Sequence, residues 1–134
     1  MIVVDASVTV KWVFEEPGTE AALALLGEEL IAPELWLAEA ANALWRHVRL
    51  GEASSAEALE RIDELANAPV ASVSISRYVH RALELATELA HSVYDCQYLA
   101  LAEHQSTYVV TNDRRFFTVG SSAGFAERIH LLGA

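Results

Sequence analysis

The sequence has little cysteine and lysine and no long apolar run, and each of these shortages excludes a class of protein. Its single cysteine, Cys96, excludes an internal disulfide. A lone thiol fits a reducing compartment, and in an apolar segment it is usually a small buried core residue. We therefore expect a cytoplasmic protein whose fold does not depend on disulfides.

Apolar runs long enough to cross a bilayer are missing as well. A spanning helix needs about 20 consecutive apolar residues, and no stretch of this chain approaches that length. The N-terminus enters a strand-like run at once, without a basic segment or a small-residue cleavage site ahead of it. We expect neither contact with a membrane nor a signal peptide.

Positive charge is the third shortage. Lysine and arginine together number 9 against 19 acidic residues, which gives a net charge of −10. Such a chain is not expected to coat nucleic acid through a general basic surface. An enzyme that meets phosphates through a bound cation is not excluded, because the cation would compensate part of the negative charge. The same charge predicts affinity for a basic partner.

Apolar residues, by contrast, are abundant. They make up 53% of the 134 residues, and a domain of this size buries roughly 68% of the surface that its unfolded chain exposes. We predict a single domain, residues 1–134, with a substantial core.

Short apolar strands alternate with helical segments along the chain. Strand patterns cover residues 2–5, 30–32, 70–74, 107–111 and 128–132. Helical patterns cover about 7–14, 20–26, 35–50, 54–67, 76–90 and 93–105, with a turn or short helix over 113–119. Ser7 is the expected N-cap of the first helix, and Ser54 and Glu57 have the spacing of a capping box. Alternation of this kind implies right-handed crossovers. We predict an α/β fold with a central, mostly parallel sheet of about five short strands and helices on both faces.

Four acidic residues interrupt or end apolar segments. Asp5 ends the first strand pattern and Asp113 closes the run from Tyr108. Glu39 and Asp95 each lie inside an apolar helical segment. Carboxylates are almost never fully buried unless they are paired or bind a metal. No lysine or arginine is spaced to neutralise these four, so they indicate a cation site.

The predicted fold brings the four acids to one place. Ligands of parallel α/β sheets bind beyond the carboxyl ends of the strands, where Asp5 and Asp113 lie. Two carboxylates about 5 Å apart repel by roughly 3 kcal/mol at an effective dielectric constant of 20. A cluster of four must therefore bind cations or hold protons with raised pKa values. Oxygen ligands select Mg²⁺, for which Mn²⁺ can substitute, and the five histidines lack zinc-site spacing and are expected as surface or packing residues.

Each acid taken alone also has an ordinary structural explanation. Asp5 could cap the first helix, Asp95 could be favoured by a helix dipole, and Asp113 could be a turn residue. Glu39 is harder to explain in this way, because apolar residues flank it on both sides. The order of all four acids along the chain favours the cation site.

Four motifs carry a resemblance to a known family. They are Val3-Val4-Asp5-Ala6-Ser7, Ala38-Glu39-Ala40-Ala41-Asn42-Ala43-Leu44, Tyr94-Asp95-Cys96-Gln97-Tyr98-Leu99-Ala100-Leu101-Ala102 and Val110-Thr111-Asn112-Asp113-Arg114-Arg115-Phe116. Together they resemble the PIN-domain ribonucleases, most closely the VapC toxins of toxin–antitoxin operons, and the resemblance covers the whole chain. Cys96 stands where a small residue such as alanine is common, a departure that leaves the acids untouched. The resemblance implies the three-layer PIN-like form of the α/β fold.

The same resemblance implies an activity and partners. It implies an Mg²⁺-dependent endoribonuclease toxin that hydrolyses phosphodiesters in a tRNA or rRNA loop and leaves 5′-phosphate and 3′-hydroxyl ends. A cognate antitoxin would neutralise it, and a homodimer is the habit of the family. Asp5, Asp95 and Asp113 would hold the metal, and Glu39 would complete the catalytic site.

Further residues of the motifs are candidates for supporting roles. Ser7 and Thr111 could orient Asp5 and Asp113, or could simply cap a helix and end a strand. Asn42 lies three residues after Glu39 on the same helical face, where it could orient that carboxylate or pair in the core. Arg114 and Arg115 follow the last acid and could contact a backbone phosphate.

Other protein classes share part of this pattern. Phosphatases of the haloacid-dehalogenase type need a second aspartate two residues after the first, and that position is Ser7. Receiver domains carry an aspartate after the third strand, and residues 70–74 end without one. The more serious alternative is a catalytically weak PIN-fold binding module that acts as antitoxin partner or co-repressor. The presence of all four acids argues against it.

Overall fold

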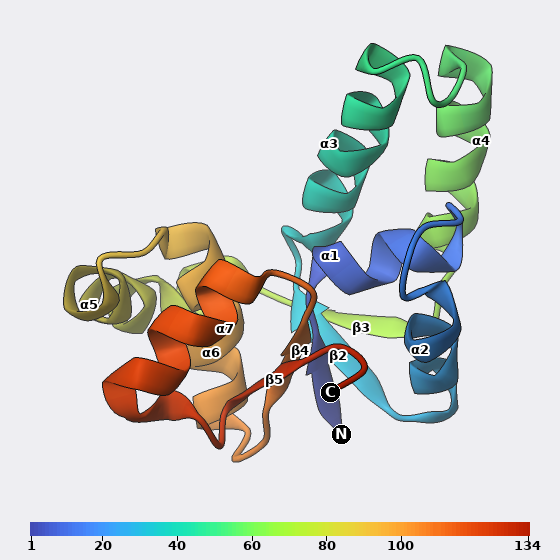
Figure 1. Ribbon diagram of the computed structural model, residues 1–134. Coiled ribbons are helices and arrows are strands. Elements are labelled where there is room, and N and C mark those ends of the chain that lie inside the picture. Colours follow the sequence, from blue (N-terminus) through green and yellow to red (C-terminus); the bar gives the residue numbers. More distant parts are fainter.

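The computed structural model describes residues 1–134 and has a central sheet of five short strands (Figure 1). The strands are β1 (Ile2–Val4), β2 (Leu30–Pro33), β3 (Val70–Val73), β4 (Val109–Thr111) and β5 (Ile129–Leu131). Their order across the sheet is β3-β2-β1-β4-β5, and every neighbouring pair is parallel. The predicted α/β class with five strands is confirmed, and the sheet is parallel throughout.

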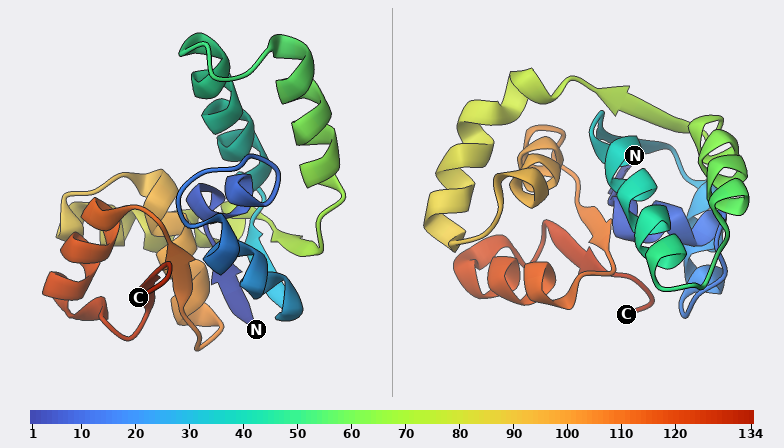
Figure 2. Two further views of the ribbon diagram at one scale, coloured as in Figure 1. Left: turned by 45° about the vertical axis from the view of Figure 1, so that its right-hand side comes forward. Right: turned by 90° about the horizontal axis from the view of Figure 1, so that it is seen from above.

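Helices cover both faces of the sheet, which gives the three layers (Figure 2). On one face are α1 (Ala6–Thr9), α2 (Thr19–Ala24), α3 (Trp36–Arg49) and α4 (Ser55–Ala66); on the other are α5 (Val79–Leu89), α6 (Val93–His104) and α7 (Arg114–Gly120). Short 3₁₀-helical turns lie at Val10–Trp12, Leu25–Gly27 and Ile75–Tyr78, and a π-helical turn lies at Ser121–Phe125. The division follows from right-handed crossovers, because the chain steps one way from β1 to β3 and the opposite way from β3 to β5.

This reversal creates a topological switch point between β1 and β4. The two strands are neighbours, with Val3 opposite Val109 and Val4 opposite Val110. The chain leaves β1 toward one face of the sheet and leaves β4 toward the other, so a crevice opens beyond their carboxyl ends. Asp5 and Asp113 follow directly on these strand ends.

Helix α6 forms the centre of the core on its face of the sheet. Every residue from Cys96 to Ala102 is buried, and the helix packs on β1, β2 and β4 as well as on α5. Such burial on all sides agrees with an apolar sequence that shows no polar face. Cys96 is a small buried core residue, as expected. A rigid, buried α6 holds the first-turn residue Asp95 in a defined position.

The start of α1 differs from the prediction. Asp5, and not Ser7, is the N-cap: its side chain accepts a hydrogen bond from the Ser7 N–H, and its backbone is extended with φ −86° and ψ 151°. An N-cap needs an extended backbone and a side-chain oxygen two or three residues before the bonded N–H, and Asp5 at the strand end supplies both. The expected cap at Ser54 is confirmed, since its Oγ accepts from the Glu57 N–H at 3.0 Å.

Helices α3 and α4 form a hairpin that extends beyond the sheet (Figure 1). The tryptophans of α3 have different environments: Trp36 is buried and donates its Nε1–H to Ser72 Oγ at 3.0 Å, whereas Trp45 is 53% exposed. An apolar groove of about 220 Å³ lies between the two helices, with Trp45, Val48, Leu59 and Ile62 among its lining residues. None of the helices in the structure combines the length and the apolar character of a membrane span.

Candidate active site

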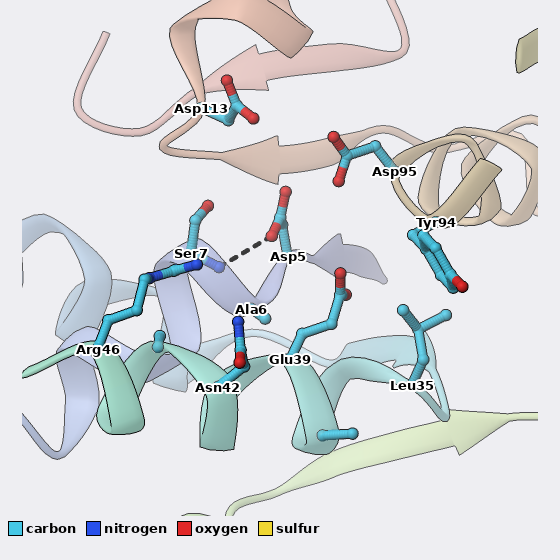
Figure 3. A pocket seen from close by; sticks show the side chains of 12 residues that line it. Asp5, Ala6, Ser7, Leu35, Glu39, Asn42, Arg46, Tyr94, Asp95 and Asp113 are labelled. Atoms are coloured by element: carbon cyan, nitrogen blue, oxygen red, sulfur yellow. Dashed lines mark hydrogen bonds between the residues drawn. The ribbon is translucent and has the colours of Figure 1, made fainter. Parts of the chain in front are cut away.

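A cleft of about 510 Å³ opens beyond the carboxyl ends of β1 and β4 (Figure 3). Four parts of the chain build it: the turn after β1, the first three turns of α3, the first turn of α6 and the turn after β4. Its lining residues are Asp5, Ala6, Ser7, Leu35, Ala38, Glu39, Asn42, Ala43, Arg46, Tyr94, Asp95 and Asp113. The structure therefore brings all four acids singled out from the sequence to one cavity.

Asp5 lies deepest of these acids. Its side chain accepts hydrogen bonds from the Ser7 N–H at 2.8 Å and from Thr111 Oγ1 at 2.7 Å. Burial raises the pKa of Asp5 to about 6, and the charge of Asp95 acts in the same direction, against the lowering effect of the two hydrogen bonds. Burial and the nearby negative charge disfavour the charged form of this carboxylate, and a bound cation would compensate for both effects.

Thr111 connects two of the acids. It is fully buried, and its Oγ1 donates to Asp5 Oδ2 while it accepts the Asp113 N–H at 3.1 Å. Ser7 reinforces the junction, because its Oγ accepts the Asn112 N–H at 2.9 Å and lies 3.4 Å from Thr111 Oγ1. These contacts tie the end of β1 to the end of β4, and the orienting roles suggested for Ser7 and Thr111 stay predictions.

Replacing Thr111 with valine is expected to lower the free energy of unfolding by about 1–3 kcal/mol, because the shape is kept while a buried donor to Asp5 and an acceptor for the Asp113 N–H are lost. The loss should be larger at about pH 8 than at about pH 5, since Asp5, with its pKa of about 6, is mostly charged at the higher pH and mostly protonated at the lower. Urea unfolding in EDTA measures it. Thr118→Val, at an exposed position on α7, is the matched control. Equal stability of the two variants would contradict the orienting role.

Glu39 receives its hydrogen bond from a residue that the sequence did not single out. The Tyr98 hydroxyl, fully buried on α6, donates to Glu39 Oε1 at 2.6 Å. Burial raises the pKa of Glu39 to about 7, and the charges of Asp5 and Asp95 add to that increase. Asn42 is exposed and lines the cleft, but no hydrogen bond joins it to Glu39. The orienting role suggested for Asn42 stays a prediction.

Asp95 has a histidine partner. His91 Nε2 lies 2.6 Å from Asp95 Oδ2, and the His91 ring stacks on Phe116 with the ring centres 5.2 Å apart. Nitrogen and oxygen atoms of His91, Asp95 and Asp113 all lie within 4.8 Å of one another, as the ligands of one metal ion would. His91 was expected only as a surface or packing residue. His91 lies four residues before Asp95, on the other side of the N-cap Ser92. This spacing could have indicated from the sequence that the two side chains meet.

Asp113 is the N-cap of α7 and accepts hydrogen bonds from the Arg115 and Phe116 N–H groups at 3.0 and 3.2 Å. Its second carboxylate oxygen is free of these bonds. Arg114 and Arg115 are exposed on α7, and neither lines the cleft. Their suggested contact with phosphate stays a prediction.

The cation that does line the cleft is Arg46. It lies seven residues after Glu39 on α3, and therefore on the same helical face two turns further on. That spacing could have been read from the sequence, but it needs the knowledge that this face of α3 borders the cleft.

The site as a whole is acidic and oxygen-rich. It contains four carboxylates and one imidazole, and Arg46 is the single arginine that lines the cleft. Carboxylate oxygens with one nitrogen donor suit Mg²⁺ or Mn²⁺, whereas the set lacks the thiolates and multiple imidazoles of a typical zinc site. The pKa values of about 6 and 7 at Asp5 and Glu39 show that the pocket disfavours uncompensated negative charge. The residues present therefore fit a divalent cation.

Comparisons of the sequence with known proteins point to one family. A model of the PIN domain matches residues 2–121. Ribonuclease VapC3 of Pyrobaculum aerophilum is 34% identical over 118 residues, a match that covers 85% of this chain and 90% of VapC3.

Solved structures have the same fold. PAE2754 from Pyrobaculum aerophilum superimposes with a TM-score of 0.70 at 24% identity. The superposition covers 96% of this chain and 81% of PAE2754. VapC20 of Mycobacterium tuberculosis, a toxin that cleaves the sarcin–ricin loop, superimposes with a TM-score of 0.70 at 18% identity and covers 95% and 98% of the two chains.

Proposed function

Because this chain belongs to the PIN-domain family, of VapC type, we propose that it is an Mg²⁺-dependent endoribonuclease toxin that hydrolyses RNA phosphodiesters. The family resemblance drawn from the four sequence motifs is confirmed by the family model and by VapC3. The observation that carries the proposal is the convergence of Asp5, Glu39, Asp95 and Asp113 in one cleft. The name of VapC3, a ribonuclease, supports the choice of RNA as substrate.

In this proposal Asp5, Asp95 and Asp113 hold the metal ion, and His91, beside Asp95, contributes a nitrogen ligand. Mn²⁺ is expected to substitute for Mg²⁺, since it accepts the same oxygen ligands and tolerates an imidazole. When bound, the ion lowers the pKa of an attacking water and stabilises negative charge on the phosphoryl oxygens.

Glu39 is suited to accept a proton from that water. Its pKa of about 7 leaves the carboxylate partly charged near neutral pH, where a general base works best. Tyr98 occupies Oε1 and fixes the orientation of the group, so Oε2 is the atom available for the proton. The proposed reaction leaves a 5′-phosphate and a 3′-hydroxyl.

The proposed RNA target is a loop of a structured RNA such as a tRNA or an rRNA. VapC20, which shares the fold, cleaves such a loop, and sequence-specific proteins generally reach RNA bases where they are unpaired. We place the activity in the cytoplasm, where these RNAs occur.

A cognate antitoxin is the proposed protein partner. The groove between α3 and α4 offers apolar contact through Trp45, Val48, Leu59 and Ile62, and the net charge of −10 favours a basic segment beside it. Homodimer formation is proposed from the family resemblance alone.

The proposal predicts that the purified protein cuts a pool of small RNAs into discrete products in Mg²⁺ or Mn²⁺ and that EDTA abolishes the cuts. Ligation and phosphatase assays on the products should find 5′-phosphate ends. Products with 2′,3′-cyclic phosphate would contradict the hydrolytic mechanism, because they arise when the ribose 2′-hydroxyl attacks. A folded, metal-binding protein that cuts nothing would instead support the binding-module alternative.

A further inference from the structure

The cleft differs chemically at its two ends (Figure 3). The four acids occupy its middle. Tyr94 and Leu35 lie on one side of them, and Arg46 lies on the opposite side. Metal binding and general-base chemistry explain the acids, but neither explains the aromatic ring or the guanidinium at the ends.

Tyr94 is unusual for a residue of α6. Most of this helix is buried, yet the Tyr94 side chain is 68% exposed beside Asp95. It takes part in no aromatic pair and donates no hydrogen bond in the structure. Leu35, just before α3, lines the same end of the cleft (Figure 3). Together they form a small apolar surface directly beside a catalytic carboxylate.

Arg46 has no ion-pair partner, although four acids line the same cleft. Two other arginines are held by acids: Arg61 pairs with Glu64 at 2.7 Å, and Arg81 pairs with Glu103 at 2.7 Å. Arg46 is exposed, extends from α3 toward the Ser7 side of the cleft and makes no such contact. A free guanidinium at the border of an acidic site is well suited to a phosphate, which it can bind through two parallel N–H donors.

We propose that these two residues align single-stranded RNA across the acids: Tyr94 stacks on an unpaired base at one side of the scissile phosphate, and Arg46 binds a backbone phosphate at the other. This inference rests on the proposed function and adds to it the two residues that position the RNA. Because every base has a π-face, Tyr94 selects for an unpaired base and not for a particular sequence. A base held in a duplex cannot reach the ring.

The test measures binding of two fluorescein-labelled probes to protein carrying Asp95→Asn, which prevents cleavage during the measurement. One probe is hexauridylate, and the other is an abasic ribose-phosphate hexamer with the same charge. Tyr94→Ala is expected to weaken hexauridylate binding about tenfold and to leave binding of the abasic hexamer unchanged, while Tyr94→Phe binds as its parent does. Selective dependence on the base distinguishes stacking from a structural role of Tyr94.

Arg46→Ala is expected to weaken binding of both probes equally and to lower the salt dependence of binding by about one released counterion. Arg49→Ala is the matched control, because Arg49 lies one turn further along α3, against the Trp45 ring at 5.0 Å and outside the cleft. That control should bind both probes as the parent does. Arg46→Lys should keep the salt dependence, since the charge remains.

The outcomes separate this inference from the proposed function. If wild-type protein cleaves RNA but Tyr94→Ala binds hexauridylate like its parent, the stacking role is wrong and the ribonuclease stands. Equal losses of both probes with Tyr94→Ala, or equal effects of Arg46→Ala and Arg49→Ala, would also overturn the corresponding role. If wild-type protein cleaves no RNA, the proposed function fails, whatever the probes show.

Discussion

Replacing Asp95 with asparagine is expected to lower the rate of RNA cleavage in Mg²⁺ by at least about 10²–10³-fold, the loss typical for removal of one preorganised charge-stabilising group. The charge of Asp95 helps to raise the pKa of Asp5, and its carboxylate lies close enough to His91 and Asp113 to share one metal ion with them. Asparagine keeps the shape of the side chain and an oxygen that can accept from His91, and the backbone N–H still reaches Ser92 Oγ. The variant should therefore lose metal binding and activity while it keeps its fold.

Initial cleavage rates on the RNA pool, together with circular dichroism, measure this effect. Asp63→Asn, at an exposed position on α4, is the matched control and should cleave like the wild type. Isothermal titration with Mn²⁺ should show weaker binding only for the Asp95 variant. Cleavage that survives Asp95→Asn would mean that the acidic cleft is not the site of the reaction.

Replacing Glu39 with glutamine is expected to have opposite effects on activity and stability. Activity should fall by about 10²-fold, the lower part of the range for general-base catalysis. At about pH 8 in EDTA the free energy of unfolding should rise by about 1–2 kcal/mol. The pKa increase from 4.5 to about 7 corresponds to roughly 3 kcal/mol at most, and the partial exposure of Glu39 reduces that figure.

The sign of the pH dependence follows from the direction of the pKa shift. The pKa of Glu39 in the folded protein, about 7, lies above its ordinary value of 4.5, so the folded state holds the proton more tightly. This contribution to stability is complete below about pH 4.5 and is lost as the pH rises through 7. Glutamine never carries the charge. Its advantage over glutamate should therefore be seen at about pH 8 and disappear at about pH 4.5.

Urea unfolding at these two pH values, with EDTA present, measures the difference. Glu28→Gln is the matched control, since Glu28 is exposed just before β2, at the amino ends of the strands and outside the cleft. Saturating Mg²⁺ should stabilise the wild type at about pH 8, because an ion that binds only the folded state adds to stability. A Glu39→Gln protein that is no more stable than wild type at about pH 8 would show that burial and repulsion do not strain this carboxylate.

These two predictions have a common cause. Four carboxylates in one partly buried cleft repel one another and lose hydration, so the site lowers the stability of the metal-free fold. Sites of this kind persist because activity requires them, and removal of one charge commonly stabilises a protein while it damages function.

The fold class and the four acids could be predicted from the sequence, because both depend on local patterns. Short apolar runs separated by helical periods are enough to indicate a parallel sheet. Asp5 and Asp113 follow strands directly, and strand ends of a parallel sheet share one edge. The prediction of the N-cap of α1 was wrong, because Asp5 and not Ser7 caps this helix. The reason is local too, since the end of a strand already has the extended backbone of an N-cap.

The supporting contacts were decided only by the tertiary structure. Tyr98 and Glu39 are 59 residues apart in the sequence, and Thr111 and Asp5 are 106 apart. Such pairs can be predicted only when the order of the strands and the positions of α3 and α6 around the cleft are known. The same is true of the cation in the cleft, which is Arg46 and not Arg114 or Arg115. Hydrogen bonds and ion contacts extend only about 3–4 Å, so they depend on the assembled fold and not on local patterns in the sequence.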